Sequence, residues 1–226
     1  MKKILSFVLI LTLMIPTLLL AGCGAKETYT INHNIESIKE NIEINGSSKG
    51  YSITLRFTTD GESEDITFAK KGFVYYVKDR DGKESYYDLG VDELLSYSKA
   101  ADATEWTAKS TKYNDNYTKI DARDDLDLVM DNYSNYLVYY AIKDIGTRTG
   151  FTSCSEEEIN GRKCLKYSQK TDDSGVKIEH TYWIEQESGI CIKYLLDTKL
   201  DGKTTSFSVE CVDYTTPYEI VIPNVQ

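Results

Sequence analysis

Histidine is scarce in this sequence, and several residue patterns that mark catalytic or metal sites are missing. The chain has two histidines, His33 and His180, which lie far in sequence from the four cysteines at 154, 164, 191 and 211. No two cysteines form a Cys-x-x-Cys pair and there is no His-x-x-x-His, so a zinc site has little support. Gly-x-Ser-x-Gly and phosphate-binding glycine loops are missing as well. We therefore expect no metal, no cofactor, no catalytic residue and no enzyme activity.

Two acidic stretches need a separate interpretation. Residues 79–84 are similar to a calcium loop, but Lys83 stands where a third oxygen ligand is expected, so we interpret them as a hairpin turn. Residues 156–158 are three glutamates just before Asn160-Gly161, and we interpret them as a solvated strand end. A catalytic pair of carboxylates meets only in space, and no feature of the sequence marks one.

After Cys23 the sequence contains no apolar run long enough to span a membrane, which takes about 20 residues. The longest apolar run lies before it. Lys2 and Lys3 precede a mostly apolar segment at 4–15, and residues 20–23 read Leu-Ala-Gly-Cys, the bacterial lipobox. This order is typical of a lipoprotein signal peptide. The alternative is a buried cysteine in an apolar helix, which does not explain the complete lipobox.

The lipobox sets the expected domain organisation. We expect cleavage between Gly22 and Cys23, which makes residues 1–22 a signal peptide. Residues 23–29 are then a lipidated cysteine with a short tether, and residues 30–226 form a single domain. A diacylglycerol on the Cys23 thiol is a stable anchor, because two acyl chains hold a protein where one does so only marginally. The expected location is the extracytoplasmic face of the bacterial cell membrane.

The charge of the chain is strongly acidic. It has 36 Asp and Glu against 26 Lys and Arg, for a formal net charge of −10, and loss of Lys2 and Lys3 with the signal peptide makes it more negative still. Such a surface repels nucleic acid and anionic lipid headgroups. We therefore expect no nucleic-acid partner, and membrane contact only through the anchor.

Four cysteines follow the lipobox: Cys154, Cys164, Cys191 and Cys211. Outside the cytoplasm an even number permits disulfides. Cys191 and Cys211 face each other across a hairpin if the turn at 201–202 has three residues, and lie on opposite faces if it has two. A Cys191–Cys211 disulfide and free buried thiols are therefore both left open.

The spacing of apolar residues changes from helical to strand-like near Gly50. Isoleucines recur every three or four residues between 31 and 42, which predicts a helix of about three turns. From Tyr51 to Phe57 apolar and polar residues alternate, which predicts a strand with one buried face. Short strands joined by tight turns follow up to Asp88 and predict an antiparallel meander, and we expect a short helix at 91–97.

The strongest helical pattern runs from Asp124 to Ile145, with acidic residues in its first turn and Gly146 after its end. Its apolar stripe has two interpretations: it packs on the sheet as core, or it forms one wall of a ligand cavity. The candidate cavity residues are Leu126, Val129, Met130, Tyr133 and Leu137.

From Phe151 the meander resumes, because four turn signals separate strand-like segments. Asn160-Gly161 is the strongest of them, since both residues accept a positive φ. The tail at 217–223, with a proline at each end, is expected to add a last edge strand. The predicted class is α+β, mainly antiparallel β.

Residues 182–193, YWIEQESGICIK, resemble a strand-turn-strand segment of the LolA/LppX-like lipoprotein superfamily, and the terminal VIPNV is similar to its closing strand. The resemblance implies a curved, incomplete barrel, or half-barrel, with helices on the concave side. It also implies either a carrier of lipids or acyl chains, or an envelope sensor or interaction module. The first hypothesis is a tethered protein that binds a lipid or other hydrophobic ligand. The alternative is a module with a filled core that binds an envelope protein.

Overall fold

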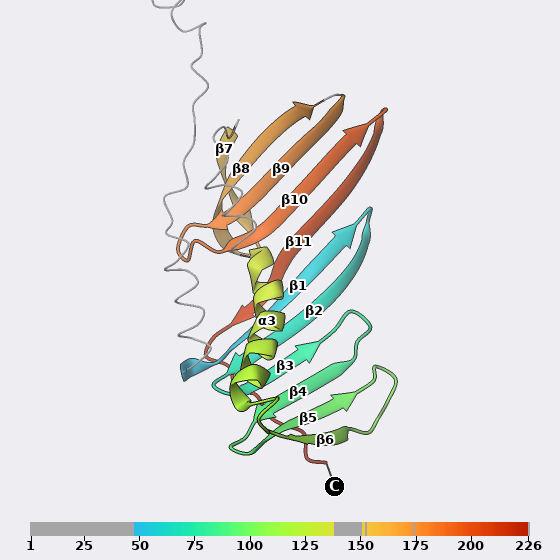
Figure 1. Cartoon of the computed structure of the whole chain (residues 1–226). Helices are drawn as coiled ribbons and strands as arrows, with labels where there is room; N and C mark the ends of the chain where they lie inside the picture. The colour runs from blue at the N-terminus through green and yellow to red at the C-terminus, as the bar shows by residue number, and fades with distance from the viewer. Residues whose placement is uncertain (1–47, 138–150, 152, 174, 226) are drawn as a thin grey trace, which may run out of the picture.

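The computed structural model describes residues 48–137, 151, 153–173 and 175–225, and these residues form one antiparallel sheet with a helix against it (Figure 1). The sheet has eleven strands in the order β6-β5-β4-β3-β2-β1-β11-β10-β9-β8-β7. The elements are β1 Tyr51–Thr59, β2 Glu62–Lys71, β3 Val74–Lys78, β4 Glu84–Leu89, β5 Glu93–Lys99, β6 Thr107–Lys112, α3 Lys119–Leu137, β7 Ser153–Ile159, β8 Arg162–Asp173, β9 Val176–Glu185, β10 Cys191–Leu200 and β11 Lys203–Thr215.

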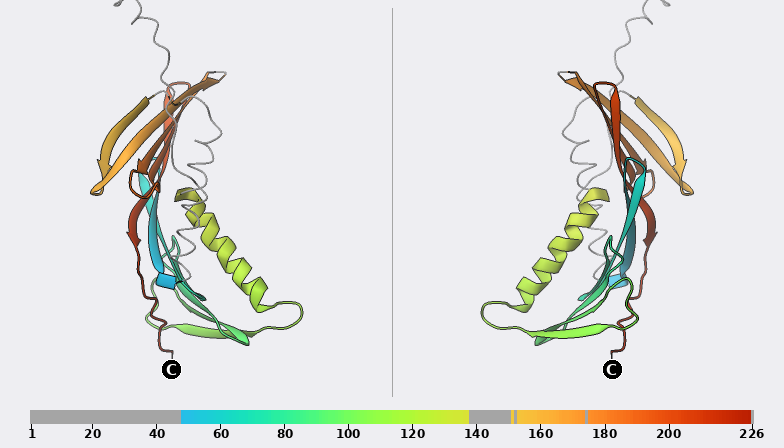
Figure 2. Two further views of the ribbon diagram at one scale, coloured as in Figure 1. Left: turned by 90° about the vertical axis from the view of Figure 1, so that its left-hand side faces the viewer. Right: turned by 90° about the vertical axis from the view of Figure 1, so that its right-hand side faces the viewer.

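Two meanders, β1–β6 and β7–β11, join where β1 pairs with β11. The pairing runs antiparallel from Ser52 opposite Thr215 to Thr59 opposite Phe207, with one irregularity between Thr54 and Leu55. Strands β6 and β7 are the two edges of the sheet, which therefore does not close into a barrel. Figure 2 shows the sheet edge-on as a curved layer with α3 along its concave side. The predicted class and half-barrel architecture are confirmed.

The hairpins are formed by the turn residues that the sequence indicated. Asp60-Gly61, Asn160-Gly161 and Asp201-Gly202 each have positive φ at both positions, from 50° to 95°. Each is a two-residue loop, since the residues on either side pair directly with each other. Mirror-image turns of this kind match the right-handed twist of the flanking strands. They fix the register of three hairpins.

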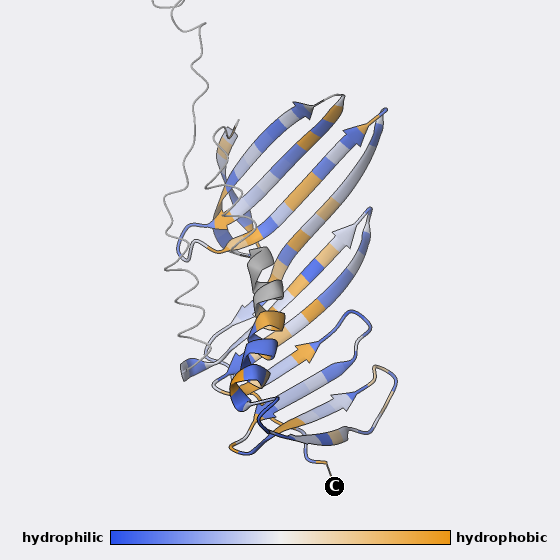
Figure 3. Ribbon diagram, in the orientation of Figure 1, coloured by the Kyte–Doolittle hydropathy of each residue, from blue (hydrophilic) through white to orange (hydrophobic). Residues whose placement is uncertain are grey.

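The helix-facing side of β1 carries its apolar residues. Tyr51, Ile53, Leu55 and Phe57 are buried, whereas Arg56 is exposed on the other face. In Figure 3 apolar segments lie along the middle of the sheet beside α3. The predicted alternation of β1 is confirmed, and its buried residues belong to a core cluster that includes Ala122 and Met130 of α3.

Two helix predictions need correction. The short helix expected at 91–97 is instead strand β5, whose backbone pairs with β4 on one side and β6 on the other. The central helix begins at Lys119 rather than Asp124, because Thr118 caps it. With β5 assigned as a strand, α3 is the one α-helix in the described part of the chain. The helix expected at 31–42 and the end of the central helix lie outside the described residues.

The tail at 217–223 is not the edge strand that we expected. It leaves β11 and crosses the sheet face opposite α3 (Figures 1 and 2). The Tyr218 N–H donates to the carbonyl oxygens of Lys49 and Gly50, both at 3.2 Å, and the Thr216 hydroxyl donates to Gly50 at 3.0 Å. These bonds tie the tail to the start of β1, away from the edge strands β6 and β7.

Candidate functional site on the concave face

The candidate cavity residues of α3 divide into buried, exposed and undescribed side chains. Met130 is 3% exposed within the core, and Leu126 is partly buried against it. Val129 is 40% exposed and so points away from the core. Tyr133 and Leu137 belong to α3, but their side chains lie outside the described part. At Leu126 and Met130 the apolar stripe is therefore core and not an open cavity wall.

A partly buried polar cluster, which the sequence did not reveal, links α3 to the sheet. Asp127 of α3 accepts hydrogen bonds from the Tyr75 hydroxyl at 2.8 Å and the Lys70 ammonium at 2.5 Å. Tyr75 is fully buried. Burial, and then the hydrogen bond to Asp127, raise the pKa of Tyr75 far above its usual value. The tyrosine therefore stays a neutral donor, and the cluster anchors the helix at the centre of the concave face.

Beyond the helix, the same face holds a hollow of about 470 Å³. Its side of the sheet is known from the register: Phe57 lies directly opposite Glu64 on β2, and Thr59 opposite Phe207 on β11. Phe57 follows the buried Leu55 by two residues, and so shares the face that α3 covers. We call this space the concave-face hollow. It is lined by Phe57, Thr59, Asp60, Glu62, Glu64, Arg80 and Phe207.

The concave-face hollow is lined by two aromatic rings and by more negative than positive side chains. Phe57 is 7% exposed and extends the core into the hollow. The Arg80 guanidinium lies 5.3 Å from the centre of the Phe57 ring and 3.5 Å from the Glu64 carboxylate. Asp60 accepts a hydrogen bond from the Ser206 N–H. With three carboxylates and one guanidinium, the lining is negatively charged.

No sequence motif indicated the concave-face hollow, because it is formed by β1, β2, β11 and Arg80 from the turn after β3. Alternation places Phe57 on the buried face, but the pairing with Phe207 becomes visible only once β1 and β11 are known to be neighbours. Phe57 and Phe207 are 150 residues apart in a chain of 226. The missing information is strand order, which apolar periodicity does not contain.

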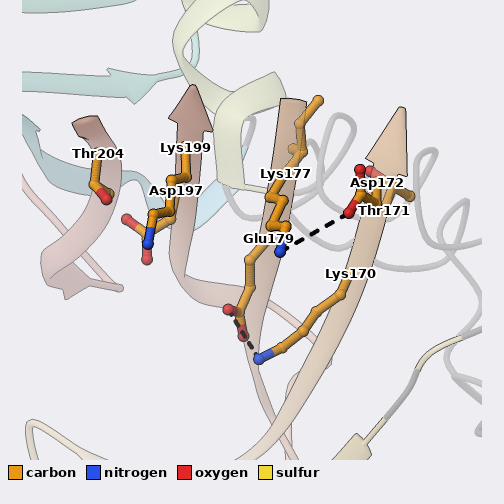
Figure 4. Close-up of a pocket in the computed structure, with 9 residues that line it drawn as sticks. Lys170, Thr171, Asp172, Lys177, Glu179, Asp197, Lys199 and Thr204 are labelled. Atoms are coloured by element: carbon orange, nitrogen blue, oxygen red, sulfur yellow. Dashed lines mark ion pairs between the residues drawn. The ribbon is translucent and has the colours of Figure 1, made fainter. Parts of the chain in front are cut away.

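A second depression, of about 440 Å³, lies on the opposite face over β8 to β11 (Figure 4). Its lysines and carboxylates pair with each other: Lys170 with Glu179 at 3.1 Å and Lys177 with Asp172 at 4.0 Å. Three lysines and three carboxylates line the depression, so its charges are balanced. We therefore use it as a comparison surface and not as a candidate site.

The cysteines of the described strands are free thiols, so the Cys191–Cys211 disulfide left open above is not formed. The turn between their strands has two residues, and Lys193 pairs with Glu210. By strand alternation this register puts Cys211 opposite residue 192 and not opposite Cys191. Both thiols are buried, and burial raises the pKa of each to about 12. They are unreactive core residues.

The acidic stretch 79–84 is a hairpin turn, as predicted. The Asp79 carboxylate accepts the Lys83 N–H at 2.9 Å, and backbone bonds close the turn. Across the described strands and helix, no group of three His, Cys, Asp or Glu side chains is arranged to hold a metal. His180 is buried, with its Nδ1 3.0 Å from the Tyr194 hydroxyl.

The membrane-related predictions concern residues outside the described ranges. Gly22 and Cys23, with the signal peptide at 1–22, belong to that part, so the lipobox remains a prediction from sequence. In the part of the chain that the structure describes, no helix has both the length and the apolar character of a membrane span.

Comparisons with known proteins give distant similarities. No family model matches the chain, and no curated protein matches it. A DUF1329 family protein from Desulfovibrio piger is similar at 12% identity over 83% of this chain and 93% of its own, with a TM-score of 0.24. An outer membrane lipoprotein-sorting protein domain, so named, from Vibrio parahaemolyticus is similar at 9% identity over 81% and 93%, with a TM-score of 0.16. Neither similarity carries weight for function.

Proposed function

We propose that the chain is a lipoprotein, anchored through Cys23 to the extracytoplasmic face of a bacterial membrane, that binds a lipid or other hydrophobic ligand without catalysing a reaction. The observation that supports ligand binding is the concave-face hollow, in which Phe57 and Phe207 extend the core toward open space. Ligand pockets are typically concave and have volumes of several hundred cubic ångströms, and the hollow has both properties.

The anchor is tested by mass spectrometry of the full-length protein purified from membranes. We expect an N-terminal peptide that begins at Cys23 and carries a diacylglycerol, because the thiol is the only nucleophile in the lipobox that forms a thioether. Cys23→Ala is the control and should leave the signal peptide uncleaved and the protein unlipidated. An unmodified peptide that runs through Gly22 and Cys23 as the main species would contradict the proposal.

Ligand binding is tested by native mass spectrometry of the lipidated protein, released from nanodiscs made of its own membrane lipids. We expect one additional lipid or hydrophobic molecule per chain. Phe207→Ser should reduce the occupancy of the bound molecule, because the substitution removes aromatic area from the floor of the hollow. Phe207 is only half-buried, so the substitution should disturb the core little. Thr204→Ser, in the depression on the opposite face, is the matched control. The proposal would be contradicted if neither the parent protein nor the Thr204→Ser control carried a bound molecule.

A second function is favoured by a different observation. Leu126 and Met130 pack against the sheet, so the described part of the helix–sheet interface is filled. A filled interior favours an envelope sensor or protein-interaction module over a carrier. Crosslinking in intact cells tests this function: one dominant protein partner, together with no bound lipid, would favour it over ligand binding.

A further inference from the structure

The charge of the concave-face hollow limits which ligands fit it. Asp60, Glu62 and Glu64 line it, against the single cation Arg80. Glu62 makes no ion pair with any residue that the structure describes, and the side chains of Arg80 and Glu64 are more than half exposed. An anionic amphiphile would therefore place its head among carboxylates, where like charges repel. A cation would find an attractive potential.

The hollow already holds a cation over one of its aromatic rings. Arg80 extends from the turn after β3 and places its guanidinium 5.3 Å from the Phe57 ring centre, beside the Glu64 carboxylate at 3.5 Å. A cation over an aromatic face is attracted by the ring quadrupole, and a nearby carboxylate adds to the attraction. Because the Arg80 side chain is more than half exposed, it can move away into solvent, and its departure uncovers the face of the Phe57 ring.

We propose that the concave-face hollow binds a small organic cation with an apolar body, such as a quaternary ammonium or amine amphiphile. The ligand's apolar part lies against Phe57 and Phe207, its charge lies among Glu62, Glu64 and Asp60, and it displaces Arg80 from the Phe57 ring. This inference rests on the proposed function, because it assigns a chemical class to the ligand of the same site. Arg80 acts as an internal competitor that occupies the ring face when the ligand is absent.

Three probes of similar shape and different charge test this proposal: benzyltrimethylammonium, benzyl alcohol and phenylacetate. Their binding is measured by isothermal titration with the full-length lipidated protein in zwitterionic nanodiscs, and empty nanodiscs give the background. We expect the cation to bind most tightly and phenylacetate most weakly. Tighter binding of phenylacetate than of the cation, or no binding of the cation, would overturn the proposal.

Variants of the charged lining give the sharper test. Arg80→Ala should strengthen binding of benzyltrimethylammonium by about twofold to fivefold, since it frees the ring face and removes a like charge. Glu62→Gln combined with Glu64→Gln should weaken it by a similar factor. Glu179→Gln on the opposite face is the control and should have no effect. Weaker cation binding by Arg80→Ala would overturn the proposal.

Failure of this inference is distinguishable from failure of the proposed function. If native mass spectrometry recovers a neutral or anionic lipid and the cationic probe does not bind, the hydrophobic-ligand function holds and the charge assignment is wrong. If the probe binds with the expected response to Arg80→Ala but no lipid is recovered, the hollow is a cation site and the lipid function is wrong.

Discussion

Gly50 lies where the C-terminal tail crosses the start of β1. Its φ is +74°, and a Cβ built on it would lie 2.1 Å from the Tyr218 carbonyl oxygen. Gly61 also has a positive φ, +95°, but a Cβ there would meet no atom within 4 Å. The two glycines thus separate the cost of backbone conformation from the cost of a clash.

Gly50→Ala is expected to lower the free energy of unfolding by more than Gly61→Ala. Gly61→Ala adds a strained conformation alone, at about 1 kcal/mol. Gly50→Ala adds the same strain and also pushes the Tyr218 backbone away, which breaks its hydrogen bonds to Lys49 and Gly50. Urea unfolding followed by circular dichroism measures both variants. Equal losses would show that the tail does not pack on Gly50 in solution.

The Tyr75–Asp127 hydrogen bond provides a second prediction for single residues. Tyr75→Phe removes one hydrogen bond and should cost about 1 kcal/mol of unfolding free energy. Asp127→Ala should cost more, about 1–3 kcal/mol, because it leaves the buried Tyr75 hydroxyl without its acceptor and Lys70 without its carboxylate. The double variant should lose less than the sum of the two. Additive losses in urea titrations would contradict the contact.

Sequence reasoning reached some of these residues and missed others, for a physical reason. Alternation correctly placed Ile53 and Leu55 in the core, because burial of one sheet face is a local pattern. Apolar spacing along the central helix grouped Val129 with Met130, although Val129 is exposed to solvent. Asp127 was counted among the acidic residues of the first helical turn, and its role was missed because its partners Lys70 and Tyr75 lie on other elements.

Among the elements, α3 has a well-defined beginning. The Thr118 hydroxyl accepts the Asp121 N–H at 3.3 Å, and the Asp121 carboxylate accepts the Thr118 N–H at 2.7 Å. This reciprocal arrangement is a capping box, in which aspartate takes the place of the usual glutamate. The pair Thr118-x-x-Asp121 was present in the sequence and could have placed the helix start five residues earlier than apolar spacing did.

Thr118→Ala should lower the free energy of unfolding by about 1 kcal/mol, because the first turn of α3 loses its side-chain acceptor. Thr118→Ser keeps the hydroxyl and should restore most of the stability. Chemical denaturation of the three proteins measures the effect. If serine were no better than alanine, the hydroxyl would not be the stabilising group.

Hairpins were more predictable than the segments between them. Asn160-Gly161 and Asp201-Gly202 encode their turns in two residues, because the positive φ values are a property of these residue types. Strand β5 was mistaken for a helix because Leu94 and Leu95 are adjacent and fit either period. Pairing with β4 and β6 decided the outcome, and that pairing is not local.

For the whole molecule, several carboxylates make stability depend on pH. A hydrogen bond from Arg56 lowers the pKa of Asp65, and one from the Trp183 indole lowers the pKa of Glu157. Unfolding returns them to their ordinary pKa values of about 4. A depressed folded pKa contributes stability that is fully present above the unfolded pKa and is lost as the pH falls through the folded pKa.

The contribution of these carboxylates to the free energy of unfolding should therefore be constant from about pH 7 to about pH 5. It should fall between about pH 4 and about pH 2. Because Asp65 and Glu157 are both about 40% exposed, each should contribute less than about 1 kcal/mol. Asp65→Asn should flatten the acid limb of a plot of unfolding free energy against pH. A variant with the same acid dependence as the parent would exclude the Arg56–Asp65 pair as a cause.

The central pairing of β1 with β11 has a consequence for how the sheet is made. Each meander forms from neighbours along the chain, but the seam that unites them needs residues from opposite ends of the described region. Loop-closure entropy and high contact order make such a seam slow to form. During synthesis β1 therefore has no partner on one side until β11 has been made. Until then the backbone groups of that free edge can pair with other chains. A strand that is paired on both sides in the finished protein is therefore an open edge, able to aggregate, in the unfinished one.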